Sequence, residues 1–242
     1  MHLHSIRSSC GFHTLLEIVS IINKRGLSGF ALTDHSPSLG TPKSHFGVLL
    51  RRMPSVIDGL RLIKGIEASV MNVDGDLDLP VFKNLEYEIV LAGLHPHDTF
   101  AVNRGREANT RALINTMRRY PQINIITHPM SDPYEVDIDA LTDVALETGT
   151  ALEINNSRFS FGRERYDALA AMVELAGEKG TMLAVNSDGH VFSEMGNFKN
   201  AISFLRQFDT DRLNIVNRSL ESTYEFLNLD IPEEAFTGLA IL

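Results

Sequence analysis

Histidine and carboxylate residues repeatedly stand at the ends of short apolar runs in this sequence. The runs GFALTDH, LRLIKGIE and YEIVLAGLH end at His35, Glu67 and His95. Runs of this length that are rich in aliphatic residues are typical of buried parallel strands. The same placement recurs at His128, Asp188 and His190, and the chain opens with His2 and His4. Because the carboxyl ends of the strands of an α/β barrel meet at one rim, we expect these side chains to lie together there.

Segments with strand-like and helix-like patterns alternate along the chain. Strands are predicted through Ala31 and over 60–66, 88–94, 123–127, 151–155, 182–186 and 214–216. Helices are predicted over 14–26, 48–57, 103–119, 137–148, 163–179, 197–207 and 220–227. This alternation favours right-handed βαβ crossovers and a parallel sheet. Since no linker, repeat or low-complexity segment interrupts it, the sequence predicts one α/β barrel domain over residues 1–242.

The side chains expected at the rim favour metal binding. Imidazole and carboxylate groups delivered from several strands are what a cluster of borderline metal ions such as zinc requires. A single histidine after a strand is usually a hydrogen-bonded loop residue, whereas six histidines joined by a glutamate and an aspartate indicate metal ligands. The pattern therefore predicts a polynuclear metal hydrolase.

The composition argues against several other classes of protein. The chain has 22 Lys and Arg against 31 Asp and Glu, a formal net charge of −9. This acidic charge argues against a nucleic-acid partner, because nucleic-acid binding usually requires a basic surface. No apolar stretch approaches the ~18–20 residues that span a bilayer, so no membrane partner is expected. The sequence has no Gly-rich phosphate-binding motif, so a nucleotide cofactor is not expected. The one cysteine, Cys10, cannot form an internal disulfide, which favours a reducing compartment and hence the cytoplasm. The oligomeric state stays open, a homo-oligomer included.

Six motifs in a fixed order resemble those of the PHP (polymerase and histidinol phosphatase) family. They are HLH at the start, then TDH, GIEA, GLH and THP after successive strands, and SDGH after the seventh. The flanking sequences NVDG and EINNS look closest to the YcdX-type phosphatase branch, and the resemblance runs from His2 to about Leu229. It implies a distorted (β/α)7 TIM-like barrel that holds three metals, usually zinc and sometimes manganese or iron.

The resemblance also implies roles for the residues at the rim. His2, His4, Glu67 and Asp188 would hold the first metal, Glu67 would bridge to a second held by His95 and His128, and His35 and His190 would hold the third. A water shared between metals would lose a proton near neutral pH and attack phosphorus as hydroxide. Glu67, Asp188 and His190 are the catalytic candidates, and Asp188, His190 or a metal-bound water could protonate the leaving group. Arg104, Arg158 and Arg163 are predicted to contact the substrate phosphate, because their loops should face the metals.

The chain departs from the family pattern at two places. The branch has a histidine six residues after the second histidine of HxH, where this chain has Cys10. A thiolate binds zinc well, so Cys10 is the favoured ligand, with a vacant position or His13 as alternatives. The family also has a first strand before HxH, whereas Met1 directly precedes His2 here. A barrel without that strand would expose the edges of two neighbours, so a truncated chain or a misassigned start is the simpler interpretation.

The leading hypothesis is a metal-dependent phosphoesterase that hydrolyses a small phosphomonoester with a metal-bound hydroxide at a di- or trinuclear site. One alternative is a PHP-type nuclease that acts on polynucleotide ends, which the acidic charge does not favour. A second alternative is a degenerate barrel that binds metal without turnover, supported only by Cys10 and the missing first strand. Substrate and native metal cannot be read from the motifs, because fold resemblance does not supply a substrate.

Overall fold

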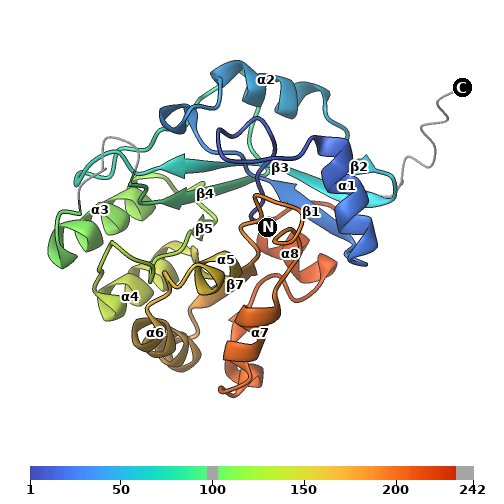
Figure 1. Ribbon diagram of the computed structural model, residues 1–242. Helices are drawn as coiled ribbons and strands as arrows, with labels where there is room; N and C mark the ends of the chain where they lie inside the picture. Colours follow the sequence, from blue (N-terminus) through green and yellow to red (C-terminus); the bar gives the residue numbers. More distant parts are fainter. Residues whose placement is uncertain (97–102, 233–242) are drawn as a thin grey trace, which may run out of the picture.

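Parallel strands form the central feature of the fold, and helices lie around them (Figure 1). The computed structural model describes residues 1–96 and 103–232. The strands are β1 (Gly29–Leu32), β2 (Val56–Ile57), β3 (Leu60–Ser69), β4 (Ile89–Gly93), β5 (Ile125–Ile126), β6 (Ala151–Asn155), β7 (Met182–Asn186) and β8 (Asn214–Ile215). The order along the sheet is β1-β3-β4-β5-β6-β7-β8 with every pair parallel, and β2 pairs antiparallel with the start of β3.

Helices follow most of the strands. They are α1 (Leu15–Lys24), α2 (Lys43–Arg52), α3 (Arg106–Arg119), α4 (Ile138–Thr148), α5 (Asn156–Ser160), α6 (Tyr166–Lys179), α7 (Lys199–Leu205) and α8 (Leu220–Phe226), with 3₁₀ turns over Pro37–Leu39 and Thr210–Arg212. The predicted fold class, a distorted α/β barrel built on a parallel sheet, is confirmed. In the described part of the chain, no helix has both the length and the apolar composition needed to cross a bilayer.

α1 forms where the sequence supplies both a cap and an amphipathic face. The Thr14 hydroxyl accepts a hydrogen bond from the Glu17 backbone N–H, and the Glu17 carboxylate accepts one from the Thr14 backbone N–H. Ile18, Val19 and Ile22 are buried together on one side of the helix. They belong to one hydrophobic cluster with residues of β1 and β3, so α1 covers this edge of the sheet.

The alternation of side chains along the strands places Glu67 inside the barrel. In β4, Ile89 and Leu91 belong to one hydrophobic cluster, whereas Val90 packs in the larger cluster with the outer helices. Ile63 of β3 joins the cluster of Ile89, and Glu67, four residues further along, faces the same side. Glu67 therefore lies in the barrel interior near the carboxyl ends of the strands.

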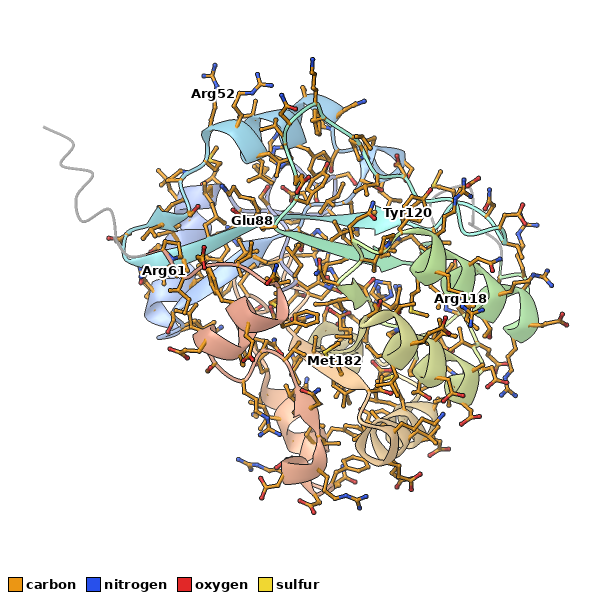
Figure 2. All side chains as sticks on the ribbon, turned by 180° about the vertical axis from the view of Figure 1, so that it is seen from behind. Arg52, Arg61, Glu88, Arg118, Tyr120 and Met182 are labelled. Carbon is orange, nitrogen blue, oxygen red and sulfur yellow. The ribbon has the colours of Figure 1, made fainter. Side chains whose placement is uncertain are left out.

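The opposite end of the barrel is closed by α8. Tyr224 and Leu227 pack in the interior cluster with residues from β1, β3, β4 and β5. The view from behind labels Glu88, just before β4, and Met182, at the start of β7, both at amino ends of strands (Figure 2). The rim that carries the predicted ligands is thus the end away from α8.

Two parts of the structure differ from the sequence prediction. The helix expected over 48–57 is α2, which begins at Lys43 and ends at Arg52. Pro54 disfavours the helical conformation at Met53, which is extended with ψ 132, and the following Val56–Ile57 pair with β3. The short helix α5 was not predicted at all. Its first turn is capped by the Asn155 side chain, which accepts a hydrogen bond from the Arg158 backbone N–H.

The N-terminal segment lies between β1 and β7 at the rim. Leu3 forms a parallel bridge with Gly189, and its carbonyl accepts the Thr33 backbone N–H at 3.0 Å. The His4 backbone N–H donates to the Gly189 carbonyl at 3.0 Å. These bonds fix the side chains of His2 and His4 in the barrel mouth. A cavity of about 600 Å³ is lined by residues of β1, β8 and α8, at the end of the barrel that faces away from the histidines.

Gly65 in β3 provides a test of the tight packing under the site. A Cβ at this position would lie 2.3 Å from Ile89 Cγ2 and 2.7 Å from the Ile89 carbonyl oxygen. We expect Gly65→Ala to lower the free energy of unfolding by about 1–3 kcal/mol, measured by urea denaturation. Gly177→Ala in α6 is the control, since its nearest contact is Leu213 Cδ2 at 3.2 Å and alanine favours a helix. Equal destabilisation by the two substitutions would contradict the packing argument.

Candidate metal centre

Side chains from the ends of the strands converge in one cluster at the rim. They are His2 and His4 from the N-terminal segment, His35 after β1, Glu67 in β3, His95 after β4, His128 after β5, and Asp188 and His190 after β7. His35 and His190 are half-buried, and the others are buried. The structure thus brings together all the histidines and carboxylates that the sequence predicted as ligands. Titratable groups at this depth require partners of opposite charge or hydrogen bonds.

The first group of ligand atoms surrounds one oxygen each of Glu67 and Asp188. His2 Nε2 lies 3.2 Å from Glu67 Oε2 and 3.4 Å from Asp188 Oδ1. His4 Nε2 lies 3.4 Å and 3.3 Å from the same two oxygens. The two Nε2 atoms are 3.1 Å apart. These four residues are the ones that the family resemblance implies for a first metal.

Glu67 faces a second group through its other oxygen. Its Oε1 lies 3.2 Å from His95 Nε2 and 3.2 Å from His128 Nε2. One carboxylate oxygen therefore faces His2 and His4, and the other faces His95 and His128. A carboxylate placed in this way can serve two neighbouring cations at once.

His35 and His190 form a third group beside His4. Ring nitrogens of these three residues lie within 4.8 Å of one another. Burial raises the pKa of the Cys10 thiol, but hydrogen bonds to His190 and His35 outweigh it and lower the pKa to about 7. The alternative ligand His13 instead lies against Phe192, with ring centroids 6.4 Å apart. The structure thus brings Cys10 into contact with both half-buried histidines.

Hydrogen bonds behind the cluster fix which nitrogen of His4 faces it. The Ser8 hydroxyl donates to Asp34 Oδ1 at 3.0 Å and accepts the His35 backbone N–H at 2.9 Å. Because a hydroxyl has only one hydrogen to donate, Ser8 accepts the hydrogen of His4 Nδ1 at 3.2 Å. Burial, together with the His190 and His35 imidazoles, lowers the pKa of His4 to about 3, so the ring is neutral. Its Nε2 therefore directs a lone pair into the cluster.

Asp34 connects this arrangement to α2. Its carboxylate accepts the Ser5 backbone N–H at 2.7 Å and the Ser5 hydroxyl at 2.8 Å, and it lies 2.8 Å from His45 Nε2. Burial raises the pKa of Asp34, but His45 and Ser5 outweigh it and lower the pKa to about 2. Asp34 stays ionised and orients Ser8 and the N-terminal loop. Partners of this kind fix the tautomer and direction of a metal-binding histidine.

Glu153 of β6 orients His2, a partner that the sequence did not identify. Its Oε1 accepts hydrogen bonds from His2 Nδ1 at 2.7 Å and Asn186 Nδ2 at 2.8 Å. Its Oε2 accepts the His128 backbone N–H at 2.8 Å and Asn155 Nδ2 at 2.9 Å. Because Nδ1 of His2 is engaged with Glu153, its Nε2 is the nitrogen that faces Glu67 and Asp188. A glutamate inside a predicted buried strand was the available signal, since such residues are rarely buried without a partner.

Two buried atoms at the centre of the cluster have no hydrogen-bond partner among the described residues. They are Glu67 Oε2 and His35 Nδ1, which lie 2.8 Å apart in a geometry that does not make a hydrogen bond. Buried polar atoms without a partner are costly. A cation between the ring nitrogens and the carboxylate would satisfy both atoms, and imidazole and carboxylate donors suit zinc, manganese or iron. The residues present therefore fit the metals that the fold implies.

The carboxylates of the cluster stay ionised despite their burial. Burial raises the pKa of Glu67, but the imidazoles of His2, His35 and His95 hold it well below its usual value. Burial also raises the pKa of Asp188, which His2 and His190 hold well below its usual value. The cluster therefore demands positive charge, which protons on the imidazoles or metal ions can supply.

Two of the predicted ligand positions have an unusual backbone conformation. His128 has φ 35 and Asp188 has φ 47, both in the left-handed region that disfavours residues with a Cβ. Strain of this kind persists where surrounding bonds enforce it, often at functional sites. At His128 the enforcing contact is the backbone hydrogen bond to Glu153.

Of the arginines predicted to contact phosphate, Arg158 lies beside the cluster. Its Nε is 4.0 Å from Asp188 Oδ2, and the side chain is half-buried. Burial and the charge of Arg158 together lower the pKa of His128 to about 4. Arg104 and Arg163 are exposed, and their contact with a substrate stays a prediction.

Comparisons with known proteins agree with this geometry. No family model matches the chain. It is 35% identical over 230 residues to a probable phosphatase of Shewanella oneidensis, covering 94% of this chain and 90% of that protein. It is 32% identical over 236 residues to the probable phosphatase YcdX of Shigella flexneri, covering 94% and 92%. The fold resembles that of histidinol phosphate phosphatase from Lactococcus lactis in complex with zinc, L-histidinol and phosphate, with a TM-score of 0.57 at 14% identity over 85% of this chain and 91% of that one.

Glu164 near Arg158 provides a test of the electrostatics beside the cluster. Burial raises the pKa of its carboxyl from 4.5 to about 7, although Arg158 opposes the shift. Between these pH values the unfolded chain loses the proton and the folded protein keeps it, so wild-type stability falls as the pH rises. Glu164→Gln removes this loss, so its stability relative to wild type should rise by on the order of 3 kcal/mol from pH 4.5 to above pH 7.

Urea denaturation at a series of pH values measures this difference. Glu174→Gln on α6 is the control, because that side chain is exposed and should follow the wild type at every pH. If the free energy of unfolding of Glu164→Gln changes with pH in parallel with that of the wild type, Glu164 is ionised throughout this pH range.

Proposed function

Since the chain belongs to the PHP (polymerase and histidinol phosphatase) family, in its branch of probable phosphatases that includes YcdX, we propose that it is a metal-dependent phosphatase. The proposed substrate is a small phosphomonoester, hydrolysed at a cluster of two or three ions. Zinc is the proposed metal, with manganese or iron as alternatives that the same donors accept. The proposal treats residues 1–242 as one barrel domain.

The observation that carries the proposal is the meeting of His2 Nε2 and His4 Nε2 at 3.1 Å. Hydrogen bonds to Glu153 and Ser8 hold the other nitrogen of each ring, so both Nε2 atoms point to the same place. Burial lowers the pKa of His2, but the carboxylates of Glu67, Asp188 and Glu153 outweigh it and hold the pKa well above its usual value, so without a cation its Nε2 carries a proton. Lone pairs repel each other unless a proton or a cation lies between them. Carboxylate oxygens of Glu67 and Asp188 at 3.2–3.4 Å complete a donor set for a cation.

The proposed ligands form three sets. His2, His4, Glu67 and Asp188 would hold the first ion, Glu67, His95 and His128 the second, and His35, His190 and Cys10 the third. When bound, such ions supply a water of lowered pKa and neutralise charge on the phosphoryl group. Glu67 fixes the spacing of the first two sets by presenting one oxygen to each. Its burial keeps bulk water away from these contacts.

Other groups at the rim would bind and protonate the substrate. The Arg158 guanidinium, 4.0 Å from Asp188, is placed to neutralise a phosphate oxygen. His190 would donate the proton that the leaving alcohol needs, because Asp188 stays ionised. His190 is the more accessible of the two, so an alcohol at the mouth would meet it first. Arg104 and Arg163 would contribute only if the substrate extends beyond the cluster.

The thiol of Cys10 ties the proposal to a reducing compartment such as the cytoplasm. Cys10 is free and half-buried, and it hydrogen-bonds to His35 and His190. A thiolate binds zinc strongly, whereas an oxidised sulfur does not act as such a ligand. The third set of ligands therefore depends on keeping this sulfur reduced.

Cobalt(II) tests whether Cys10 is a ligand. Wild-type protein loaded with cobalt should show a thiolate-to-cobalt charge-transfer band in the near ultraviolet, which Cys10→Ser should lose. The control His13→Ala should keep the band, since His13 lies against Phe192 rather than among the ligands. A cobalt-loaded wild type without the band, or a band that persists in Cys10→Ser, would exclude Cys10 from the site.

Hydrolysis of p-nitrophenyl phosphate tests the proposed activity. With zinc or manganese added, wild type should hydrolyse this ester, and Glu67→Gln should lower kcat/KM by at least ~100-fold because it removes the shared carboxylate charge. Glu174→Gln, an exposed position on α6, is the matched control and should keep wild-type activity. Full activity in Glu67→Gln, or a wild type that cleaves polynucleotide ends but no monoester, would contradict the proposal.

A further inference from the structure

Among the described histidines and carboxylates of the cluster, His190 has the most exposed side chain. The side chains of His2 and His4 have no exposed surface, whereas that of His190 is 24% exposed. Cys10, which contacts His190, is also half-buried. A substrate can therefore reach the proposed metal site past the loops that carry Cys10 and His190. These loops are residues 5–13 and 188–196.

The two entrance loops carry large exposed apolar side chains. Phe12 is 71% exposed, Phe192 is 65% exposed and Ile6 is 56% exposed. We call these three residues the entrance patch. Exposed aromatic groups at a site entrance are more informative than isolated ones elsewhere, because contiguous apolar surface on a soluble protein commonly marks a binding site.

Backbone hydrogen bonds hold the entrance patch against the cluster. The Phe12 N–H donates to the His190 carbonyl at 3.1 Å, and the Ile6 N–H donates to the His13 carbonyl at 2.7 Å. The His13 ring in turn lies edge-on to Phe192, with centroids 6.4 Å apart. The loop after HxH and the loop after β7 thus meet at His190. A molecule whose phosphate occupies the metal site would project its alcohol portion toward this junction.

The entrance offers little charge to a polar substrate. Between Ser5 and His13 the one Lys, Arg, Asp or Glu is Arg7. At the other loop, the Arg25 guanidinium donates to the Phe192 and Ser193 carbonyls at 3.5 Å and 3.4 Å. The Glu194 carboxylate accepts the His190 and Val191 backbone N–H groups at 2.9 Å and 3.3 Å. Recognition of a second phosphate or of a densely hydroxylated sugar would call for more hydrogen-bonding groups than these. An aromatic face, by contrast, can stack on Phe12 or Phe192.

We propose that the entrance patch binds the alcohol portion of the substrate and selects aryl phosphomonoesters over polar ones. This inference rests on the proposed function and names the substrate class of the same site. Phe12 and Phe192 would contact the aromatic ring of the leaving group, and Ile6 would extend the apolar surface beside them. Phosphate binding would stay with the metals and Arg158, so the patch sets which alcohol is accepted.

The ratio of kcat/KM for phenyl phosphate to that for glycerol 3-phosphate tests the proposal. Wild type should favour phenyl phosphate. Phe12→Ser and Phe192→Ser should each lower the ratio about tenfold, mainly through KM for phenyl phosphate, because stacking is lost. Val81→Ser, which removes an exposed apolar side chain between β3 and β4, is the control and should keep the wild-type ratio.

The outcomes separate this proposal from the one on which it rests. A wild type that hydrolyses neither ester with zinc or manganese contradicts the phosphatase itself. A wild type that hydrolyses both, with a ratio unchanged in Phe12→Ser and Phe192→Ser, overturns only the aryl preference. Size-exclusion chromatography of the same proteins tests whether the entrance patch instead binds a second copy of this chain. A wild-type oligomer that both variants dissociate, again without a change in the ratio, would assign the patch to contact between copies of this chain and also overturn the proposal.

Discussion

A single buried carboxylate, Glu67, is the group on which the rest of the site depends. It lies in the barrel interior because the alternation of β3 places it on the same side as Ile63. Its oxygens face ring nitrogens of His2, His4, His35, His95 and His128 at 2.8–3.4 Å. Burial alone would make this charge unfavourable, so the surrounding segments must deliver positive charge to it. The barrel brings the histidines to this carboxylate because several parallel strands end at one rim.

Orientation of the imidazoles comes from a second layer of polar groups. Ser8 and Asp34 direct His4, Glu153 directs His2, and Ser69 hydrogen-bonds to His95 Nδ1 at 3.1 Å. His190 Nδ1 donates to the Asp188 backbone carbonyl at 3.0 Å, which leaves its Nε2 for the cluster. These contacts connect α2, β3 and β6 to the site, so the fold and the donor set stabilise one another. A ligand set held in this way loses little conformational freedom when it binds a cation.

Local patterns were sufficient to predict much of the fold and the residues that meet at the rim. The strands over 151–155 and 182–186 have the predicted bounds, because each is a short aliphatic run with clear breaks at both ends. Six of the eight clustered histidines and carboxylates were identified because they follow such runs, and His2 and His4 were identified from the motif HLH at the start of the chain. Tertiary partners were beyond this reasoning: nothing local pairs Asp34 with His45 of α2, or Glu153 with His2. Arg158 lies beside the cluster, whereas Arg104 and Arg163, predicted on the same grounds, are exposed, and no local feature distinguishes the three.

The central claim is that the converging lone pairs around Glu67 hold metal ions that also stabilise the fold. The most direct test is to count ions per chain in native mass spectra before and after chelation, with thermal unfolding followed on the same samples. We expect two or three transition-metal ions per chain, a lower Tm after chelation, and recovery of both on addition of zinc. A chain that binds no ion under these conditions and unfolds at the same temperature with and without chelator would contradict the account.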